Sequence, residues 1–91
     1  MQASAANNIV PVTLELGGKS PQLFFEDANL ESALPFLVNA GIQNGGQTCS
    51  ASSRILVHRS RYNEVVDHMY QKYKVLIVRP AINDVAFGPL I

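Results

Sequence analysis

A chain of 91 residues can form one small domain with a modest hydrophobic core, or a piece of a larger fold. Seven basic residues balance seven acidic ones, which excludes a strong field for nucleic acid or anionic lipid, and one cysteine excludes an internal disulfide. Apolar residues make up 47% and charged residues 15% of the sequence, a composition more apolar than usual for a free-standing domain and typical of a segment from a larger buried body.

The expected location follows from what the sequence lacks. Its first ten residues, MQASAANNIV, contain no basic segment followed by a long apolar core, and no apolar run approaches membrane-spanning length. Histidine and cysteine do not cluster with the spacing of metal ligands. We therefore expect a protein of a reducing compartment, the cytoplasm, with no metal and no nucleic-acid or membrane partner.

The first quarter of the chain predicts a helix end followed by two strands. Residues 1–8 are small and polar and are typical of the last turn of a helix that ends at Asn7 or Asn8. Val12–Leu16 is rich in β-branched residues and predicts a strand, which the Gly17-Gly18 pair ends. After Ser20-Pro21, the apolar run Gln22–Phe25 predicts a second short, buried strand.

The next segment has helical periodicity. Apolar residues recur every three or four positions from Leu30 onward, and Asp27 or Asn29 can cap the helix start. Pro35 either kinks this helix or begins a second helical piece that ends near Gln43. The glycine pair that follows is expected to stop the helix before the cysteine.

The second half predicts a strand, a helix and a turn-rich tail. Arg54–His58 is apolar and β-branched, like a strand covered on both faces, and Ser60 is the expected cap of the next helix. Val75–Ile91 contains prolines, glycine and Asn-Asp and predicts a turn-rich connection. The expected buried face of the helix consists of six residues at helical spacing: Tyr62, Val65, Val66, Met69, Tyr70 and Tyr73.

This order of elements predicts the α/β class. Two consecutive strand–helix units imply that Gln22–Phe25 and Arg54–His58 pair in parallel through a helical crossover. Parallel sheets are normally covered by helices on both faces, and two helices with about three strands cannot provide this cover. We therefore expect a short parallel βαβα segment with an incomplete sheet.

The stretch Asn44–Arg54, NGGQTCSASSR, contains the single cysteine, Cys49. Flexible small residues precede it and small hydroxylated residues follow it, so a ligand can approach the backbone closely on either side. This environment is typical of an exposed nucleophile. A lone free cysteine is nevertheless more often a small buried hydrophobic residue, and that reading stays open on this pattern alone.

Glu15 lies in a second suggestive stretch, VTLELGGKSP. It lies at the end of an apolar, β-type run that is followed at once by Gly17 and Gly18, and its apolar neighbours Leu14 and Leu16 favour partial burial of the carboxyl group. The alternative is a solvated carboxylate at the end of a strand. Taken alone, the motif does not decide between the two.

Together, the segments VTLELGGKSP and GQTCSASSR resemble the two signature segments of the NAD(P)-dependent aldehyde dehydrogenases, and the separation of 34 positions from Glu15 to Cys49 matches the family's spacing. The resemblance extends over nearly the whole chain, including the closing FGPLI. It implies a partial aldehyde dehydrogenase catalytic-domain fold. It also implies that Cys49 is the catalytic nucleophile, Glu15 the general base, and Leu16 and Gly17 the residues against the nicotinamide of NAD or NADP.

The resemblance implies a covalent oxidation of a small-molecule aldehyde to a carboxylic acid. The Cys49 thiolate would attack the carbonyl carbon to form a thiohemiacetal, and hydride transfer to the cofactor would leave a thioester. Glu15 would activate the water that hydrolyses this thioester, and the Cys49 backbone N–H would help to stabilise the oxyanion.

The family's glycine-rich cofactor loop and the asparagine of its oxyanion hole, both upstream of the glutamate motif, have no counterpart in this sequence. We therefore expect a fragment that is inactive alone: residues 1–18 a remnant of the cofactor-domain edge with the glutamate motif, and residues 19–91 a partial catalytic domain. The resemblance implies a homo-oligomer for the full-length form. The expected alternatives are a cofactor-independent thiol esterase and a non-catalytic piece that docks with a complementary chain.

Overall fold

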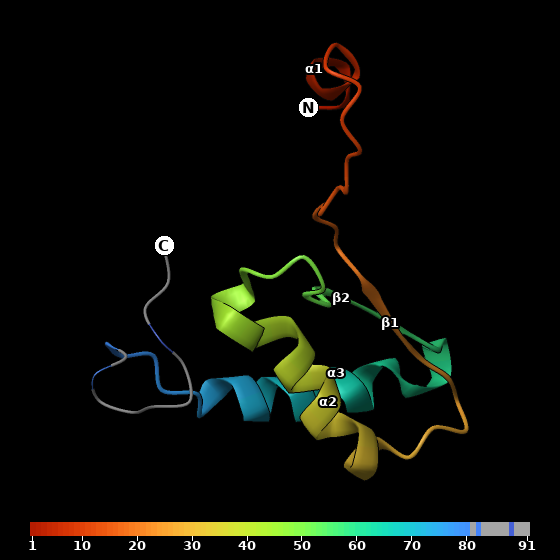
Figure 1. Cartoon of the computed structure of the whole chain (residues 1–91). Helices are drawn as coiled ribbons and strands as arrows, with labels where there is room; N and C mark the ends of the chain where they lie inside the picture. The colour runs from red at the N-terminus through yellow and green to blue at the C-terminus, as the bar shows by residue number, and fades with distance from the viewer. Residues whose placement is uncertain (81, 83–87, 89–91) are drawn as a thin grey trace.

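The computed structural model describes residues 1–80, 82 and 88. A two-stranded sheet and two long helices form the body, and the N-terminal residues extend away from it (Figure 1). The predicted α/β class is confirmed. The described elements, in chain order, are α1 (Gln2–Ala6), β1 (Pro21–Phe24), α2 (Leu30–Ile42), the 3₁₀ turn η1 (Gln43–Gly46), β2 (Arg54–Val57), the 3₁₀ turn η2 (Arg59–Arg61) and α3 (Tyr62–Lys74).

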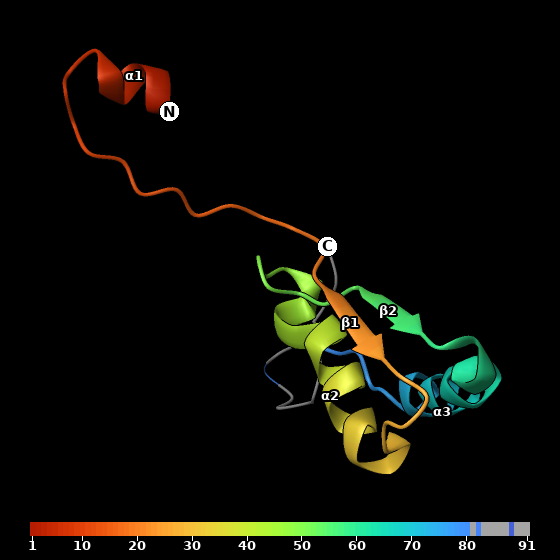
Figure 2. The ribbon, with the colours of Figure 1, turned by 90° about the vertical axis from the view of Figure 1, so that its right-hand side faces the viewer.

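The two strands pair in parallel, as predicted. Pro21 lies opposite Arg54 and Phe24 opposite Val57, so the four residue pairs follow one continuous register without a bulge. Figure 2 shows both strands side by side and pointing the same way. Because the strands are parallel, the segments that lead into them meet at the same edge of the sheet.

Helix α2 begins at a side-chain cap. Asn29 has extended backbone angles, and its Oδ1 accepts a hydrogen bond from the Ser32 backbone N–H at 2.9 Å. Of the two predicted caps, Asn29 is therefore the one used. The helix continues through Pro35 as one element to Ile42, which shows that the proline does not begin a separate helical piece.

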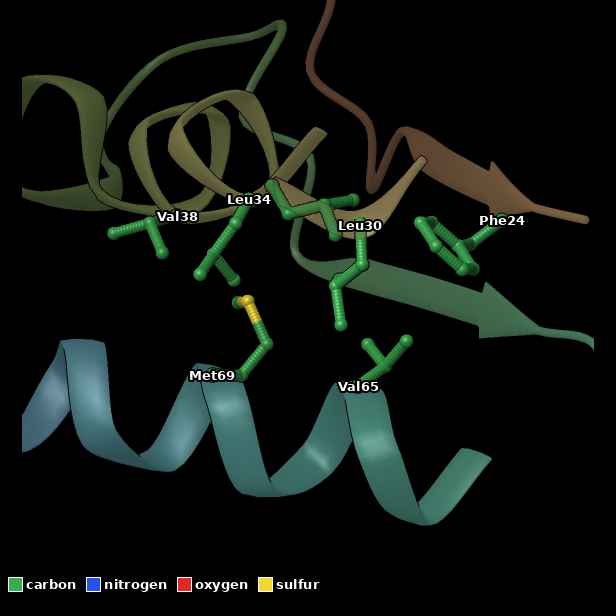
Figure 3. Close-up of a cluster of buried hydrophobic side chains, with 7 residues drawn as sticks. Phe24, Leu30, Leu34, Val38, Val65 and Met69 are labelled. Atoms are coloured by element: carbon green, nitrogen blue, oxygen red, sulfur yellow. The ribbon is translucent and has the colours of Figure 1, made fainter. Parts of the chain in front are cut away.

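A single apolar cluster joins the sheet to both long helices. Figure 3 shows Val65 and Met69 of α3 pointing toward the leucines of α2, with Phe24 of β1 at one end. Full burial of each such side chain is worth about 1.5–3 kcal/mol. The cluster consists of Phe24, Leu30, Leu34, Leu37, Val38, Val65 and Met69.

The buried face of α3 is narrower than the sequence predicts. Val65 and Met69 are buried as expected, whereas Val66, Tyr62 and Tyr70 are exposed. Among the described elements, α2 packs on this helix and the sheet adds Phe24 to the same cluster, so only a narrow stripe of the helical surface is covered. The three tyrosines of the predicted buried face are Tyr62, Tyr70 and Tyr73, and the predicted packing role is therefore wrong for Tyr62 and Tyr70.

The predicted Ser60 cap of this helix is also wrong. Helix α3 begins at Tyr62, after the η2 turn, and its N-cap residue Arg61 makes no side-chain cap hydrogen bond. The Ser60 hydroxyl lies instead 2.8 Å from Nδ1 of His58. A local hydrogen bond between neighbouring side chains thus takes the hydroxyl that was expected at the helix start.

The predicted strand Val12–Leu16 is absent: the chain from Val10 to Ser20 has no regular secondary structure. These residues are exposed except Ser20, and β1 pairs only with β2 among the described residues. A β-branched run forms a strand only where another strand offers its backbone groups, so propensity alone misleads here. The helix predicted to end near Asn7 is confirmed as α1.

The C-terminal tail is described only in part. Helix α3 ends at Lys74, and Leu76–Pro80 contains no helix, as predicted for a connection. The closing FGPLI segment lies outside the described residues apart from Gly88.

Arg61 ties α3 to the turn after β1. Its Nη1 donates to the backbone carbonyl oxygens of Glu26 at 2.7 Å and Ala28 at 3.1 Å, and its guanidinium carbon lies 5.3 Å from the Phe24 ring centroid. Its Nε donates to Oε2 of Glu64 at 2.6 Å. This hydrogen bond lowers the pKa of Glu64, and the positive charge of the Arg61 guanidinium lowers it further.

Loss of the Asn29 cap should destabilise the fold. Asn29→Ala leaves the Ser32 N–H without its partner, so we expect the free energy of unfolding to fall by about 1 kcal/mol in a urea titration. Asn63→Ala, which removes an exposed amide from α3, is the matched control and should change it by less than about 0.5 kcal/mol. Equal effects of the two substitutions would contradict the capping role.

The Arg61–Glu64 pair should give a defined acid dependence of stability. Because the pKa of Glu64 in the folded state lies below its ordinary value of 4.5, the pair stabilises the fold above that pH. The contribution disappears as the pH falls through the lower folded-state pKa. Urea midpoints measured between about pH 3 and 6 should therefore fall less steeply on acidification for Glu64→Gln than for the unmodified chain. Asp67→Asn on the same helix is the control, and a slope reduced equally by both substitutions would refute the assignment.

Candidate functional site

The cysteine loop begins at a left-handed turn. Asn44, Gly45 and Gly46 have φ angles of 52°, 68° and 76°. Glycine adopts such angles without steric cost and asparagine tolerates them better than most residues, which explains this residue order after α2. The turn ends the helix and redirects the chain into the segment that carries Cys49, as the glycine pair predicted.

Behind Cys49 the loop is anchored to the body. Ala51 is buried, and the Ser52 N–H donates to the Ala40 carbonyl oxygen at 2.9 Å. The side chain of Gln22 donates to two carbonyl oxygens, that of Leu37 at 3.1 Å and that of Ser52 at 3.3 Å. The loop is therefore held against α2 and β1 by its own backbone groups.

A glycine in α2 permits this close packing. A Cβ atom added at Gly41 would lie 3.1 Å from the Tyr73 hydroxyl oxygen and 3.6 Å from the Ser52 carbonyl oxygen. The partial burial that accompanies this packing raises the pKa of Tyr73. Among the three tyrosines predicted to pack, Tyr73 is thus the one that lies near the cysteine loop.

Cys49 itself is a free, exposed thiol. The hydroxyl oxygens of Thr48 and Ser50, its two neighbours, lie 3.3 Å apart and form a hydrogen bond beside it. The sulfur is therefore accessible to a small electrophile, in agreement with an exposed nucleophile and not with a packed core thiol.

Glu15, Leu16 and Gly17 lie on the extended N-terminal segment. All three are exposed, and a Cβ atom added at Gly17 or Gly18 would meet no atom within 4 Å. In Figures 1 and 2 this segment leaves the body at the start of β1. Among the described contacts, no hydrogen bond joins Glu15 to Cys49.

One link does join the two motifs. Nε of Arg54, the last residue of the cysteine stretch, donates to the backbone carbonyl oxygen of Lys19 at 2.8 Å. Lys19 belongs to the glutamate stretch and lies 35 positions away in the sequence. Sequence reasoning gave neither Arg54 nor Gln22 a role, because a bond from a side chain to a distant carbonyl leaves no periodic signal.

An open pocket of about 730 Å³ adjoins the start of the cysteine loop. Cys49 does not line it, although Gln47 does, two residues before. Amide side chains dominate the polar part of its lining: Gln22, Asn39, Gln43, Asn44 and Gln47. Asn39, in the last turn of α2, and Gln43, directly after that helix, are four positions apart, a polar pattern that the apolar periodicity of the helix obscured in the sequence.

Two further searches concern only residues 1–80, 82 and 88. Within that part of the chain, no three histidine, cysteine, aspartate or glutamate side chains gather in a group that could hold a metal ion. No helix there has both the length and the apolar character needed to span a membrane.

Comparison with known proteins identifies the family of the chain. The model of the aldehyde dehydrogenase family matches residues 1–91. Betaine aldehyde dehydrogenase of Atriplex hortensis is 45% identical over 92 residues, which cover 100% of this chain and 18% of that protein.

Solved structures of the family agree in fold. A proposed aldehyde dehydrogenase of Burkholderia cenocepacia has a TM-score of 0.95 and 54% identity, covering 98% of this chain and 19% of that one. The NAD⁺ complex of an aldehyde dehydrogenase from Bacillus cereus has a TM-score of 0.92 and 40% identity, covering 99% and 18%. The chain thus spans less than a fifth of the length of these relatives. By the match along all of its residues, it belongs to the aldehyde dehydrogenase family.

Proposed function

We propose that this chain carries the nucleophile and the general base of an NAD(P)-dependent oxidation of an aldehyde to a carboxylic acid. The observation that carries the proposal is the parallel register of β1 and β2. Glu15 precedes Pro21 by six residues and Cys49 precedes Arg54 by five, and these two strand residues are register partners. Both motifs therefore enter the sheet at the same edge.

Cys49 is the nucleophile of this proposal. Its exposed sulfur, as the thiolate, forms a bond to the carbonyl carbon of the aldehyde, and the carbonyl oxygen becomes an alkoxide. The backbone N–H of Cys49 is the donor proposed to stabilise that oxygen. Loss of the hydride from the same carbon restores the carbonyl and leaves an acyl group on the sulfur as a thioester.

Glu15 completes the reaction as the general base. Its carboxylate takes a proton from water, and the resulting hydroxide adds to the thioester carbon. The C–S bond then breaks, and the carboxylic acid and the Cys49 thiolate are released. A thiolate is a tolerable leaving group, which explains why a cysteine suits both the first and the last step.

The proposed cofactor is NAD or NADP, which when bound supplies the hydride acceptor. Leu16 and Gly17 are the residues proposed to lie against its nicotinamide ring. Both are exposed, and the open space beside Gly17 allows a flat ring to approach the backbone. The Bacillus cereus relative, similar along 99% of this chain, is an NAD⁺ complex.

The proposed domain assignment divides the chain near the start of β1. Residues 1–18, with the glutamate motif, would border the cofactor domain, and residues 19–91 would belong to the thiol-bearing catalytic domain. The apolar cluster lies entirely in the second part, which agrees with this division. A reducing compartment such as the cytoplasm would keep the Cys49 thiol free for the reaction.

The acyl half of the reaction can be tested on the 91-residue chain without any cofactor. p-Nitrophenyl acetate should acetylate Cys49 and release p-nitrophenolate, and the acetyl thioester should then decay by hydrolysis. Because Glu15 activates the water, we expect deacylation, followed by intact-protein mass spectrometry, to slow about tenfold or more in Glu15→Gln.

Two further variants define the controls of that measurement. Cys49→Ala should take up no acetyl group, and Glu31→Gln, which removes an exposed carboxylate from α2, should deacylate at the unmodified rate. Equal deacylation rates in Glu15→Gln and Glu31→Gln would refute the base role of Glu15.

A second candidate function, docking with a complementary chain, is favoured by the outer face of the sheet. Leu23 and Leu56 are register partners, point away from the buried cluster and are 61% and 54% exposed. Paired apolar side chains on an open sheet are typical of a surface that another element covers. The proposed partner is a chain that supplies the rest of the family fold.

Co-expression tests this docking directly. The Bacillus cereus relative, with its matching segment deleted, should co-purify with the 91-residue chain and lose it when Leu23 and Leu56 are both replaced by Asp. Gln71→Asp, on an exposed position of α3, is the control and should keep the complex. Absence of co-purification with the unmodified chain would exclude this candidate.

A further inference from the structure

Two side chains link the glutamate stretch and the cysteine stretch reciprocally. Arg54, from the cysteine side, donates its Nε–H to the Lys19 carbonyl oxygen at 2.8 Å. Gln22, from the glutamate side, donates from Nε2 to the Ser52 carbonyl oxygen at 3.3 Å. Arg54 thus holds a backbone carbonyl of the glutamate stretch, and Gln22, the residue directly after that stretch, holds a backbone carbonyl of the cysteine stretch.

The links lie where both motifs enter the sheet. Lys19 lies four residues after Glu15 and two before Pro21. Ser52 lies three residues after Cys49 and two before Arg54, the register partner of Pro21. The ladder pairs only four residues of each strand and does not reach Glu15 or Cys49. The two side-chain bonds therefore extend the connection between the strands toward the reacting groups.

The Ser52 peptide is held on both of its polar groups. Its N–H donates to the Ala40 carbonyl oxygen at 2.9 Å, and its carbonyl accepts from Gln22, whose Nε2 also reaches the Leu37 carbonyl oxygen at 3.1 Å. Gln22 therefore fixes the loop relative to α2 and β1 together. A shorter or apolar side chain could not make both bonds.

We propose that Gln22 and Arg54 are positioning residues that set the place of the Cys49 loop relative to the Glu15 segment. The inference rests on the proposed function, since it concerns how the two proposed catalytic groups are brought together. Neither residue touches the substrate in this account, because each acts through a backbone carbonyl. Loss of either bond should weaken the influence of Glu15 on Cys49.

The single cysteine provides a charge-sensitive readout. Cys49 can be alkylated with iodoacetate, an anion, and with iodoacetamide, which is neutral, and both reagents react with the same thiolate. The ratio of the two rates reports the local charge, whereas thiolate fraction and loop accessibility affect both rates alike. A change in general stability alone would not move this ratio.

Glu15→Gln should raise the iodoacetate-to-iodoacetamide ratio about twofold at low ionic strength, because a nearby negative charge no longer repels the anionic reagent. In a Gln22→Leu background the same substitution should leave the ratio unchanged. Gln71→Leu, an exposed amide on α3, is the matched background and should keep the twofold effect. Circular dichroism of each variant establishes that it is folded.

Arg54→Lys supplies a second background, since it keeps the charge but lacks Nε, and should likewise abolish the Glu15→Gln effect. It replaces Gln22→Leu as the test if that variant does not fold. A twofold effect retained in both backgrounds would overturn the positioning role while leaving the Glu15–Cys49 pairing intact. No effect in the unmodified chain or the Gln71→Leu background would overturn the pairing, and the positioning role with it.

Discussion

The parallel pairing of β1 with β2 is the constraint on which the rest of the structure depends. Opposed residues such as Pro21 and Arg54 bring two stretches that are distant in sequence to one edge of the sheet. The helical crossover between the strands makes this parallel arrangement possible. One stretch then carries an accessible carboxylate and the other an accessible thiol, which is the combination that acyl chemistry through a thioester requires.

The packing around this sheet is one-sided. Phe24 faces the helices and joins the buried cluster, whereas its strand neighbour Leu23 faces outward and is largely exposed. On the covered side, the face of the sheet that packs against the helices, Arg61 donates hydrogen bonds to the Glu26 and Ala28 carbonyl oxygens. It also donates to the Glu64 carboxylate. The loop that carries Cys49 is attached to this covered side through the buried Ala51 and the hydrogen bond from Ser52 to α2.

Sequence reasoning predicted features that depend on local pattern. The helix from Leu30, a cap at Asp27 or Asn29 and the parallel strands all follow from periodicity, capping chemistry and crossover rules. The strand expected at Val12–Leu16 failed because its formation depends on a pairing partner, which no local pattern reveals. The cross-links made by Gln22 and Arg54 also stayed hidden, since they join residues 30 and 35 positions apart. The roles proposed for Glu15 and Cys49 came from family resemblance and not from the residues alone.

The distance between the glutamate stretch and the sulfur tests the central claim most directly. A nitroxide attached to Cys49, the only thiol in the chain, reports nearby backbone amides through the broadening of their NMR signals. The account predicts strong broadening of the amide signals of Glu15, Leu16 and Gly17, which lie far from Cys49 in sequence. Signals from these three residues that keep their full intensity in the labelled, folded chain would contradict it.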